Sequence, residues 1–222
     1  ISGNVTEGNI IVNTTDKGTV RLILNNASIS NTTTAPIKVL NAKKVILTLA
    51  DNTTNTITDK TRQSVDDEDF SSAVYSKADL VFNGSGTLNV NAGYRNGIKS
   101  TNDLKVVSGT FNITSNEDGI IGKDLLGIKD GKFTIKSGSD GMKSMYDTDT
   151  SKGNIVITGG EFDITASNDG VHCNEDILIS GGNLTISSGD DGVHADANLQ
   201  VDGGTIDIKK CYEGLEGVHI TL

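Results

Sequence analysis

The sequence predicts an all-β fold in which the chain winds into a parallel β-helix, a solenoid with about 22 residues in each coil. The composition favours strands, because glycine occurs 26 times in 222 residues, proline once, and Val, Ile, Thr, Asn and Ser exceed the helix-favouring Ala, Glu and Arg. A glycine motif recurs at nearly constant spacing, and alternating polar and apolar runs accompany it. Three short strands and three tight turns account for one repeat.

The glycine motif occurs six times, and each glycine follows an acidic or amide residue. The pairs are Asn96-Gly97, Asp118-Gly119, Asp140-Gly141, Asp169-Gly170, Asp191-Gly192 and Glu213-Gly214. Successive motif glycines are separated by 22, 22, 29, 22 and 22 residues. The longer step equals one repeat with seven additional residues, which we assign to a polar loop insertion at residues 146–153.

A second set of glycines keeps the same phase, each lying ten residues before the next motif glycine: Gly109, Gly131, Gly160, Gly182 and Gly204. An alternating run follows each of them, as in residues 110–114 and 132–136. Such alternation predicts a strand with one buried face. Stacked coils would then place Phe111, Phe133 and Phe162 in one internal ladder, at the interstrand spacing of about 4.8 Å.

We expect a single solenoid domain over residues 1–222, because no Pro-, Gly- or Ser-rich linker interrupts the series. Residues 1–70 fit the repeat as irregular N-terminal coils, and residues 71–222 form the regular coils. The acidic segment 64–69 predicts a solvated loop. An open strand at the last coil would aggregate unless covered. We therefore expect a continuation beyond Leu222, a capping partner, or an oligomer formed through the exposed solenoid end.

The charge and hydropathy of the chain exclude two classes of partner. Lys and Arg total 19 against 29 Asp and Glu, so the formal net charge is −10 and nucleic acid binding is not expected. The longest apolar runs, such as residues 44–50, are far shorter than the roughly 20 residues of a membrane helix, so we expect no membrane insertion. The first residues lack the features of a signal peptide, and we expect any export signal to have been removed.

Five consecutive coils place a carboxylate immediately before the motif glycine: Asp118, Asp140, Asp169, Asp191 and Glu213. At about 5 Å and an effective dielectric of about 20, each neighbouring pair would repel by roughly 3 kcal/mol. Raised carboxyl pKa values or bound cations would relieve this repulsion. Alternatively, Asp-Gly and Asn-Gly simply satisfy tight turns, with glycine supplying a positive φ.

Further oxygen ligands surround this acidic column: Asn168, Asn174, Asp190, Asp196 and Glu216. Carboxylate and amide oxygens without thiolates are the ligand set of Ca²⁺. We therefore expect calcium to bind at the column, most strongly in the last three coils.

The outward position two residues after the motif glycine holds candidate sugar-binding residues. Three roles are open to Lys99 and Lys143. Each could form an ion pair with the carboxylates, contact an acidic sugar, or act as a general base. His172 and His194 stack on adjacent coils, but no third nitrogen or sulfur ligand for zinc follows in register. Tyr94 and Tyr212 add aromatic contacts, although the tyrosines are scattered and Trp is absent.

The two cysteines lie two coils apart, which is too far for a disulfide. Cys173 falls in an inward ladder of small residues, and Cys211 lies three residues before a motif glycine. We expect both to be free thiols with a structural role.

Residues 73–88 and 191–196 resemble a bacterial, clostridial-type family of carbohydrate-binding parallel β-helix proteins. The resemblance implies a right-handed single-stranded parallel β-helix, with calcium sites like those of pectate-lyase-type polysaccharide lyases. It also implies an extracellular or cell-surface location and recognition of plant cell-wall polysaccharide. Carried onto this chain, the calcium role falls on the Asp-Gly positions. Asn96 departs from the usual aspartate, so its coil is expected to bind metal poorly.

These features predict calcium-dependent binding of a cell-wall polysaccharide. The expected ligand is an acidic polysaccharide such as polygalacturonate (pectin), with cellulose as a further ligand. Calcium would let a protein of charge −10 hold a polyuronate. We expect no enzymatic activity. The alternative is a calcium-dependent polysaccharide lyase of pectate-lyase type with Lys99 or Lys143 as base, and a structural surface spacer is a third reading.

Overall fold

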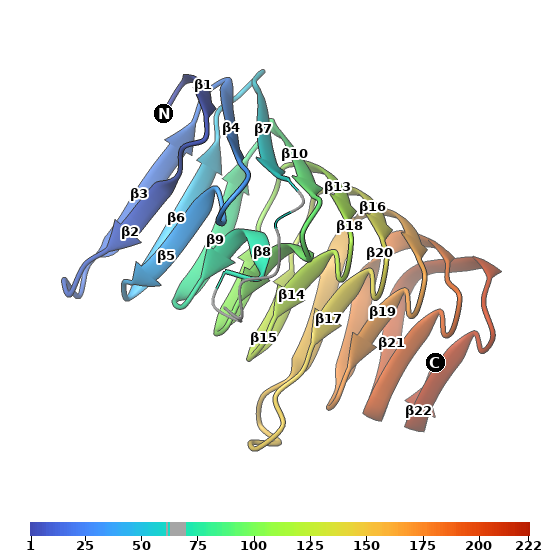
Figure 1. The fold of residues 1–222 in the computed structure, drawn as a ribbon. Helices are drawn as coiled ribbons and strands as arrows, with labels where there is room; N and C mark the ends of the chain where they lie inside the picture. The colour runs from blue at the N-terminus through green and yellow to red at the C-terminus, as the bar shows by residue number, and fades with distance from the viewer. Residues whose placement is uncertain (61, 63–69) are drawn as a thin grey trace.

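The computed structural model describes residues 1–60, 62 and 70–222. Their secondary structure consists of strands and turns, and the chain forms a parallel β-solenoid of about nine turns with about 24 residues per turn (Figure 1). The prediction of an all-β parallel β-helix is confirmed. The acidic segment predicted as a solvated loop, residues 64–69, lies outside the described residues.

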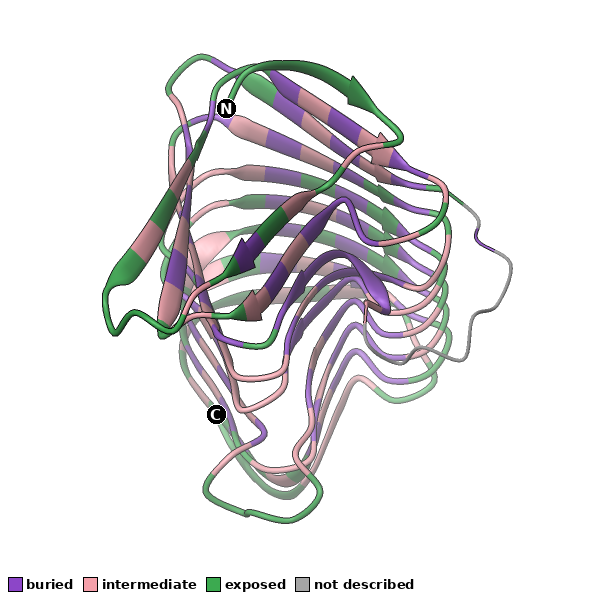
Figure 2. Ribbon diagram, turned by 60° about the vertical axis from the view of Figure 1, so that its left-hand side comes forward, coloured by how far each residue is buried: buried purple, intermediate pink, exposed green. Residues whose placement is uncertain are grey.

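Each coil contributes a strand to three faces, which we name A, B and C, and which enclose the core (Figure 2). Face A consists of β2 (Ile10–Asn13), β5 (Ile37–Asn41), β8 (Ser72–Ser76), β11 (Asn96–Ser100), β14 (Ile120–Gly122), β17 (Met142–Ser144) and β19 (Val171–Cys173). Face B consists of β3 (Thr19–Leu24), β6 (Lys44–Leu49), β9 (Asp79–Gly84), β12 (Asp103–Val106) and β15 (Leu125–Ile128). Face C consists of β1 (Gly3–Thr6), β4 (Ala27–Asn31), β7 (Thr54–Asp59), β10 (Thr87–Ala92), β13 (Thr110–Ser115) and β16 (Lys132–Ser137).

The last coils contain longer strands that turn the corner from one face to the next. These are β18 (Asn154–Ala166), β20 (Ile177–Ser187), β21 (Val193–Lys210) and β22 (Leu215–Thr221). The first residues of β21 and β22 extend face A, and later residues of the same strands pair on face B. All of these pairings are parallel, so equivalent residues of successive coils lie side by side.

The pairing register on face A confirms the repeat. Ile98 pairs with Ile120, and the series continues through Met142, Val171, Val193 and Leu215. These are the 22-residue steps with one longer step at the insertion. In the N-terminal coils the equivalent residues Ile10, Ile37, Val74 and Ile98 are 27, 37 and 24 positions apart. The longer N-terminal steps explain why the mean coil exceeds 22 residues.

Inward side chains form the ladders that the alternation predicted. Phe111, Phe133 and Phe162 are buried, with ring centroids 5.1 Å and 4.8 Å apart in successive stacked pairs. Figure 2 shows buried positions alternating with less buried ones along many of the strands, as in β13 and β16. Stacked rings bury apolar area in every coil and fix the register of its neighbours.

The two sets of glycines are required for different physical reasons. Gly109 and its equivalents have positive φ, for example 125° at Gly109 and 138° at Gly131, which glycine adopts without strain. The motif glycines do not, so the expectation of positive φ in the Asp-Gly turns is wrong. A Cβ on Gly119 would lie 2.4 Å from the carbonyl oxygen of Gly141 and 2.6 Å from Cγ2 of Ile135. Close approach of neighbouring coils therefore requires glycine there.

The polar insertion connects β17 to β18 and is held by the coils on both sides of it. The backbone N–H of Tyr146 donates to Oδ1 of Asn174, and Nδ2 of Asn174 donates to the carbonyl of Tyr146, both at 2.9 Å. Lys152 forms a 2.9 Å ion pair with Asp124. Within residues 1–60, 62 and 70–222 the structure contains no helix long and apolar enough to cross a membrane.

Candidate functional site

Face A carries the predicted functional residues in two adjacent columns. The acidic column lies at the start of each coil's face A strand, and the outward column lies beside it. The pairing register places Lys99, Ile121, Lys143, His172, His194 and Glu216 at equivalent positions of the outward column. The sequence predicted this arrangement.

In four successive coils a side-chain oxygen before the motif glycine, from Asn96, Asp118, Asp140 or Asp169, accepts a hydrogen bond from the next coil. The backbone N–H of Asp118 donates to Oδ1 of Asn96, and that of Asp140 donates to Oδ1 of Asp118, both at 3.0 Å. Asp169 donates in the same way to Asp140 at 3.1 Å, and Asp191 donates to Asp169 at 2.9 Å. These hydrogen bonds stabilise the stacking of the coils. The other carboxylate oxygen, Oδ2, contacts side chains of the outward column, as in Asp140 with Lys143 and Asp169 with His172.

The charge of the middle coils is compensated within the protein. Asp140 is fully buried, and its Oδ2 lies 2.5 Å from Nζ of Lys143, which is also 3.9 Å from Oδ2 of Asp118. Nδ2 of Asn168 donates to Oδ1 of Asp140 at 2.7 Å. Burial alone would raise the pKa of Asp140, but the contact with His172 and the hydrogen bonds from Lys143 and Asn168 hold that pKa well below its usual range. Lys143 and Asn168 therefore relieve part of the repulsion expected along the column.

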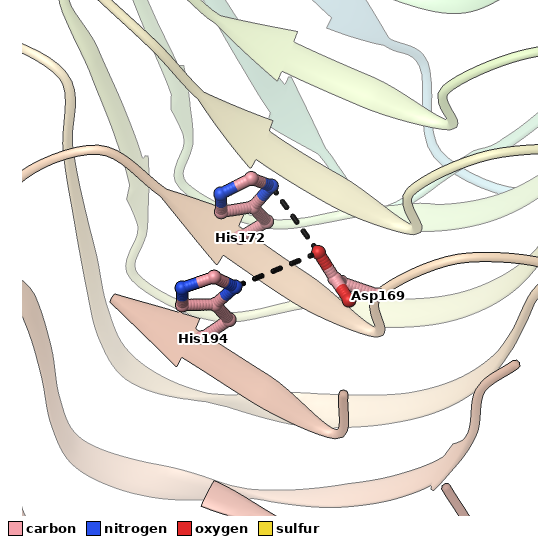
Figure 3. Close-up of side chains that lie close together, drawn as sticks. All are labelled: Asp169, His172 and His194. Atoms are coloured by element: carbon pink, nitrogen blue, oxygen red, sulfur yellow. Dashed lines mark ion pairs between the residues drawn. The ribbon is translucent and has the colours of Figure 1, made fainter. Parts of the chain in front are cut away.

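Two histidines replace lysine in the later coils. The rings of His172 and His194 stack with centroids 4.6 Å apart and 9° between their planes (Figure 3). Oδ2 of Asp169 lies 3.2 Å from Nδ1 of His172 and 3.9 Å from Nδ1 of His194. Nδ1 of His194 is also 3.5 Å from Asp191 and 3.4 Å from Glu216. Imidazole nitrogens and carboxylate oxygens therefore converge in this part of face A.

Burial and neighbouring charges shift the ionisation of this cluster. Burial opposes the charged form of His172, but the contact with Asp140 and the charges of Asp140 and Asp169 outweigh it and raise the pKa of His172. Burial also raises the pKa of Asp169, against the hydrogen bond from the backbone of Asp191. Both shifts reflect an excess of negative charge in a partly buried place, which a cation would relieve.

An open hollow of about 410 Å³ lies over the later coils of face A, and its lining contains most of the predicted ligands: Asn168, Asp169, His172, Asp190, Asp191, His194, Tyr212, Glu213 and Glu216. Tyr212 is 80% exposed at its edge. Asp196 lies beside the hollow, with Oδ1 3.2 Å from Nε2 of His194 and 3.7 Å from Nε2 of His172. The structure thus gathers residues that are separated by up to 48 positions in the chain.

A second hollow of about 270 Å³ lies over the earlier coils of the same face, and its lining is richer in positive charge: Ser71, Arg95, Asn96, Lys99, Glu117, Asp118, Ile121, Lys123, Lys143 and Met145. Nζ of Lys99 donates to Oγ of Ser71 at 3.3 Å. Arg95 and Lys123 are not among the site residues predicted from the sequence. Both lie next to repeat positions, Arg95 directly before Asn96, so their phase in the repeat could have identified them.

Two predicted site residues have other partners. Asn174 bonds the backbone of Tyr146 with both polar atoms of its side chain, so it anchors the insertion and the structure does not bring it to the acidic column. The ring of Tyr94 lies under the guanidinium groups of Arg62 and Arg95, at 4.6 Å and 5.5 Å. Tyr94 therefore borders the basic hollow through Arg95, which is one of its lining residues.

The oxygen donors of the later coils fit a calcium ion. Asp169, Asp190 and Asp191 offer carboxylate oxygens within 4.8 Å of one another. Oδ1 of Asp191 is buried and has no hydrogen-bond partner among the described residues. A buried carboxylate oxygen without a donor is costly unless a cation or a water meets it. Hard oxygen ligands of this kind suit Ca²⁺.

Comparison with known proteins gives the family. The chain matches, over residues 1–220, a family described as carbohydrate-binding domain-containing proteins. A curated relative of that description from Acetivibrio thermocellus is 35% identical over 115 residues, which make up 50% of this chain and 40% of the relative. A solved structure described as the polysaccharide lyase-like protein from C. thermocellum, a gadolinium derivative, aligns with a TM-score of 0.81 and 29% identity over 100% of this chain and 85% of that chain. The chain therefore belongs to the carbohydrate-binding domain-containing protein family.

Proposed function

We propose that the protein binds an acidic cell-wall polysaccharide, such as polygalacturonate, on face A in a calcium-dependent manner. The observation that carries this proposal is the pair of hollows on one face, one rich in cations and one lined by carboxylates. A polysaccharide is long enough to cross several coils, so one chain can contact both hollows. Since the proposed ligand lies in cell walls, the proposal places the protein outside the cell or on a bacterial cell surface.

The basic hollow gives an acidic sugar a direct partner. Arg95, Lys99 and Lys123 bring positive charge to the earlier coils, and Lys143 stands at the boundary with the later ones. Arginine and lysine bind carboxylates by charge-assisted hydrogen bonds, which are stronger than neutral ones. A protein of net charge −10 thereby presents a local surface that attracts a uronate.

The acidic hollow requires a cation before a uronate can approach. Asp169, Asp190 and Asp191 would hold Ca²⁺ there, and the ion would supply positive charge for sugar carboxylates.

Cellulose is a weaker candidate ligand. Neutral glucans are commonly held by exposed aromatic rings, which bury the apolar side of a sugar. Tyr212 offers such a ring at the edge of the acidic hollow, whereas the ring of Tyr94 is already covered by Arg62 and Arg95. One aromatic platform favours a chain held by charge over a crystalline surface held by stacking.

A lyase with a lysine base is the second candidate function, favoured by the lyase-like description of the structural neighbour. The surroundings of Lys143 count against it. Burial lowers the pKa of Lys143, but the hydrogen bond to Asp140 and the charges of Asp118, Asp140 and Asp169 outweigh burial and raise it. A general base needs a pKa near the working pH. Absence of unsaturated uronides, measured by ultraviolet absorbance after incubation with polygalacturonate, would favour the binding protein.

The proposal is tested by comparing an acidic and a neutral ligand. Asp191→Ala is expected to weaken binding to polygalacturonate at least tenfold and to change binding to a neutral β-glucan far less, as measured by affinity electrophoresis with and without a chelator. Asp202→Ala, on the exposed part of face B, is the matched control and should bind as the wild type does. Equal losses for both sugars would indicate a loosened coil, and no loss for either would place the sugar elsewhere.

A further inference from the structure

We propose that Asp169, His172 and His194 form a binding site for a divalent transition-metal ion, with zinc as the ion that the donor set fits best. Two imidazole nitrogens and a carboxylate oxygen are a donor set typical of zinc and not of calcium, which takes oxygen ligands. This inference concerns metal binding alone and stands or falls independently of the sugar.

The fold brings the three ligands together from successive coils. Asp169 lies just before β19, His172 lies within β19, and the parallel register pairs His172 with His194 in β21. Their ligand atoms lie within 4.8 Å of one another (Figure 3). Two tetrahedral zinc ligands at 2.0–2.1 Å from the ion are about 3.3 Å apart. The Asp169 oxygen is 3.2 Å and 3.9 Å from the two Nδ1 atoms, so only small movements are needed.

A second observation points to a missing ligand at this place. Nδ1 of His172 is buried and makes no hydrogen bond of good geometry among the described residues, although Oδ2 of Asp169 lies 3.2 Å away and Oδ2 of Asp140 lies 3.6 Å away. Burying a polar nitrogen without a partner is costly. A metal ion between Asp169 and the two rings would satisfy that nitrogen.

Asp196 gives the two rings the orientation that metal-binding histidines usually have. Its Oδ1 lies 3.2 Å from Nε2 of His194 and 3.7 Å from Nε2 of His172, on the ring edges away from Asp169. A carboxylate there favours the tautomer with the proton on Nε2, which leaves the lone pair of Nδ1 for a metal. The chain therefore supplies both the ligands and the carboxylate that orients them.

The stacked rings must change slightly to bind an ion. Their planes are 9° apart, so the two Nδ1 lone pairs run side by side, whereas an ion must lie near the plane of each ring. His194 is the ring that we expect to tilt, because its side chain is 22% exposed against 15% for His172. Tilting would bring its Nδ1 toward Asp169 and keep Asp191 and Glu216 near enough to balance the charge.

The neighbouring positions of the outward column differ in charge. The preceding position holds Lys143, whose ammonium repels a cation, and the following one holds Glu216, which forms a second group of possible ligands with Asp191 and His194. Asp169 also belongs to the oxygen-only group with Asp190 and Asp191. Since both groups use Asp169, zinc and calcium are expected to compete, with nitrogen ligands favouring zinc.

The experiment uses the full chain without a histidine tag, freed of metal by a chelator and then titrated with Zn²⁺ by calorimetry and with Co²⁺ by visible absorption. The wild type is expected to bind one zinc ion with an affinity at least tenfold higher than for Ca²⁺. His172→Gln and His194→Gln should each lower the affinity for zinc at least tenfold. His219→Gln is the matched control, because His219 is the remaining histidine and is exposed on the last strand.

A measurement on the wild type keeps the inference testable if a variant misfolds. Zinc should shift the nuclear magnetic resonance signals of two imidazole rings and leave those of His219 unchanged. The inference is overturned if the wild type binds no zinc, if the histidine variants bind it as tightly as the control, or if zinc leaves the imidazole signals unmoved. If the wild type binds zinc but does not bind polygalacturonate, the proposed function is contradicted and the metal site remains supported.

Discussion

Replacing Lys143 by methionine should destabilise the solenoid markedly, because it removes the cation that compensates a fully buried carboxylate. Nζ of Lys143 lies 2.5 Å from Oδ2 of Asp140, whose side chain has no exposed area, and 3.9 Å from Asp118. Methionine keeps most of the length and apolar volume of the lysine stem. The variant therefore tests charge compensation with little change in packing.

The expected cost follows from the burial of the pair. Removing one partner of a buried ion pair costs about 3–5 kcal/mol, because the other charge stays buried and unpaired. The side chain of Lys143 is 23% exposed, and Asp140 keeps the hydrogen bonds from Asn168 and from the backbone of Asp169. We therefore expect the lower end of that range, about 3 kcal/mol in the free energy of unfolding.

Denaturation by urea measures this loss, and a surface pair provides the control. Lys132 and Glu161 are 3.6 Å apart, with both side chains 66% exposed, so Lys132→Met should cost about 1 kcal/mol or less. Because coils of a solenoid contact only their neighbours, hydrogen exchange should accelerate most around β14, β17 and β19. A loss for Lys143→Met no larger than for Lys132→Met would refute the reasoning that this lysine neutralises the column.

Three further predictions concern packing, thiol chemistry and metal. Gly119→Ala should lower the unfolding midpoint, because the added Cβ would lie 2.4 Å from the carbonyl oxygen of Gly141. Gly127→Ala is the control and should be tolerated, because the nearest atom to its added Cβ is 3.4 Å away. Equal midpoints for the two variants would contradict this reasoning. Burial raises the pKa of Cys173 to about 12, so iodoacetamide at pH 8 should label the more exposed Cys211 first, as read by mass spectrometry, and labelling of Cys173 first would be inconsistent. Calcium at a hundredfold excess over Kd should stabilise the fold by about 2.7 kcal/mol in thermal melts, and a midpoint unchanged by chelator would count against it.

The sequence was sufficient to predict the solenoid, its register and the residues that face outward. In the regular coils, the 22-residue period with its one insertion leaves a single way of stacking that keeps Phe111 above Phe133 and His172 beside His194. Shifting a strand by one residue would expose its whole apolar set, so the alternation determines both faces of every strand. Residues at repeat positions could therefore be placed without coordinates.

Contacts between side chains across coils could not be predicted in the same way. The period places Lys143 next to the acidic column, but only the geometry shows that it pairs with Asp140, which is its partner at 2.5 Å. Asn174 has the phase of a ligand, yet the insertion at residues 146–153 supplies Tyr146 as its partner instead. The motif glycines have the sequence of a turn, but close approach between coils is what requires them. These contacts depend on which side chains the turns and the insertion bring close to a residue in a neighbouring coil.

The most direct test of the proposed function is a crystal structure with a short oligogalacturonate and calcium bound. We expect the sugar to lie along face A, with carboxylates near Arg95 and Lys123 at one end and near calcium held by Asp190 and Asp191 at the other. A sugar bound on face B or face C, or bound on face A with no calcium at these aspartates, would contradict it.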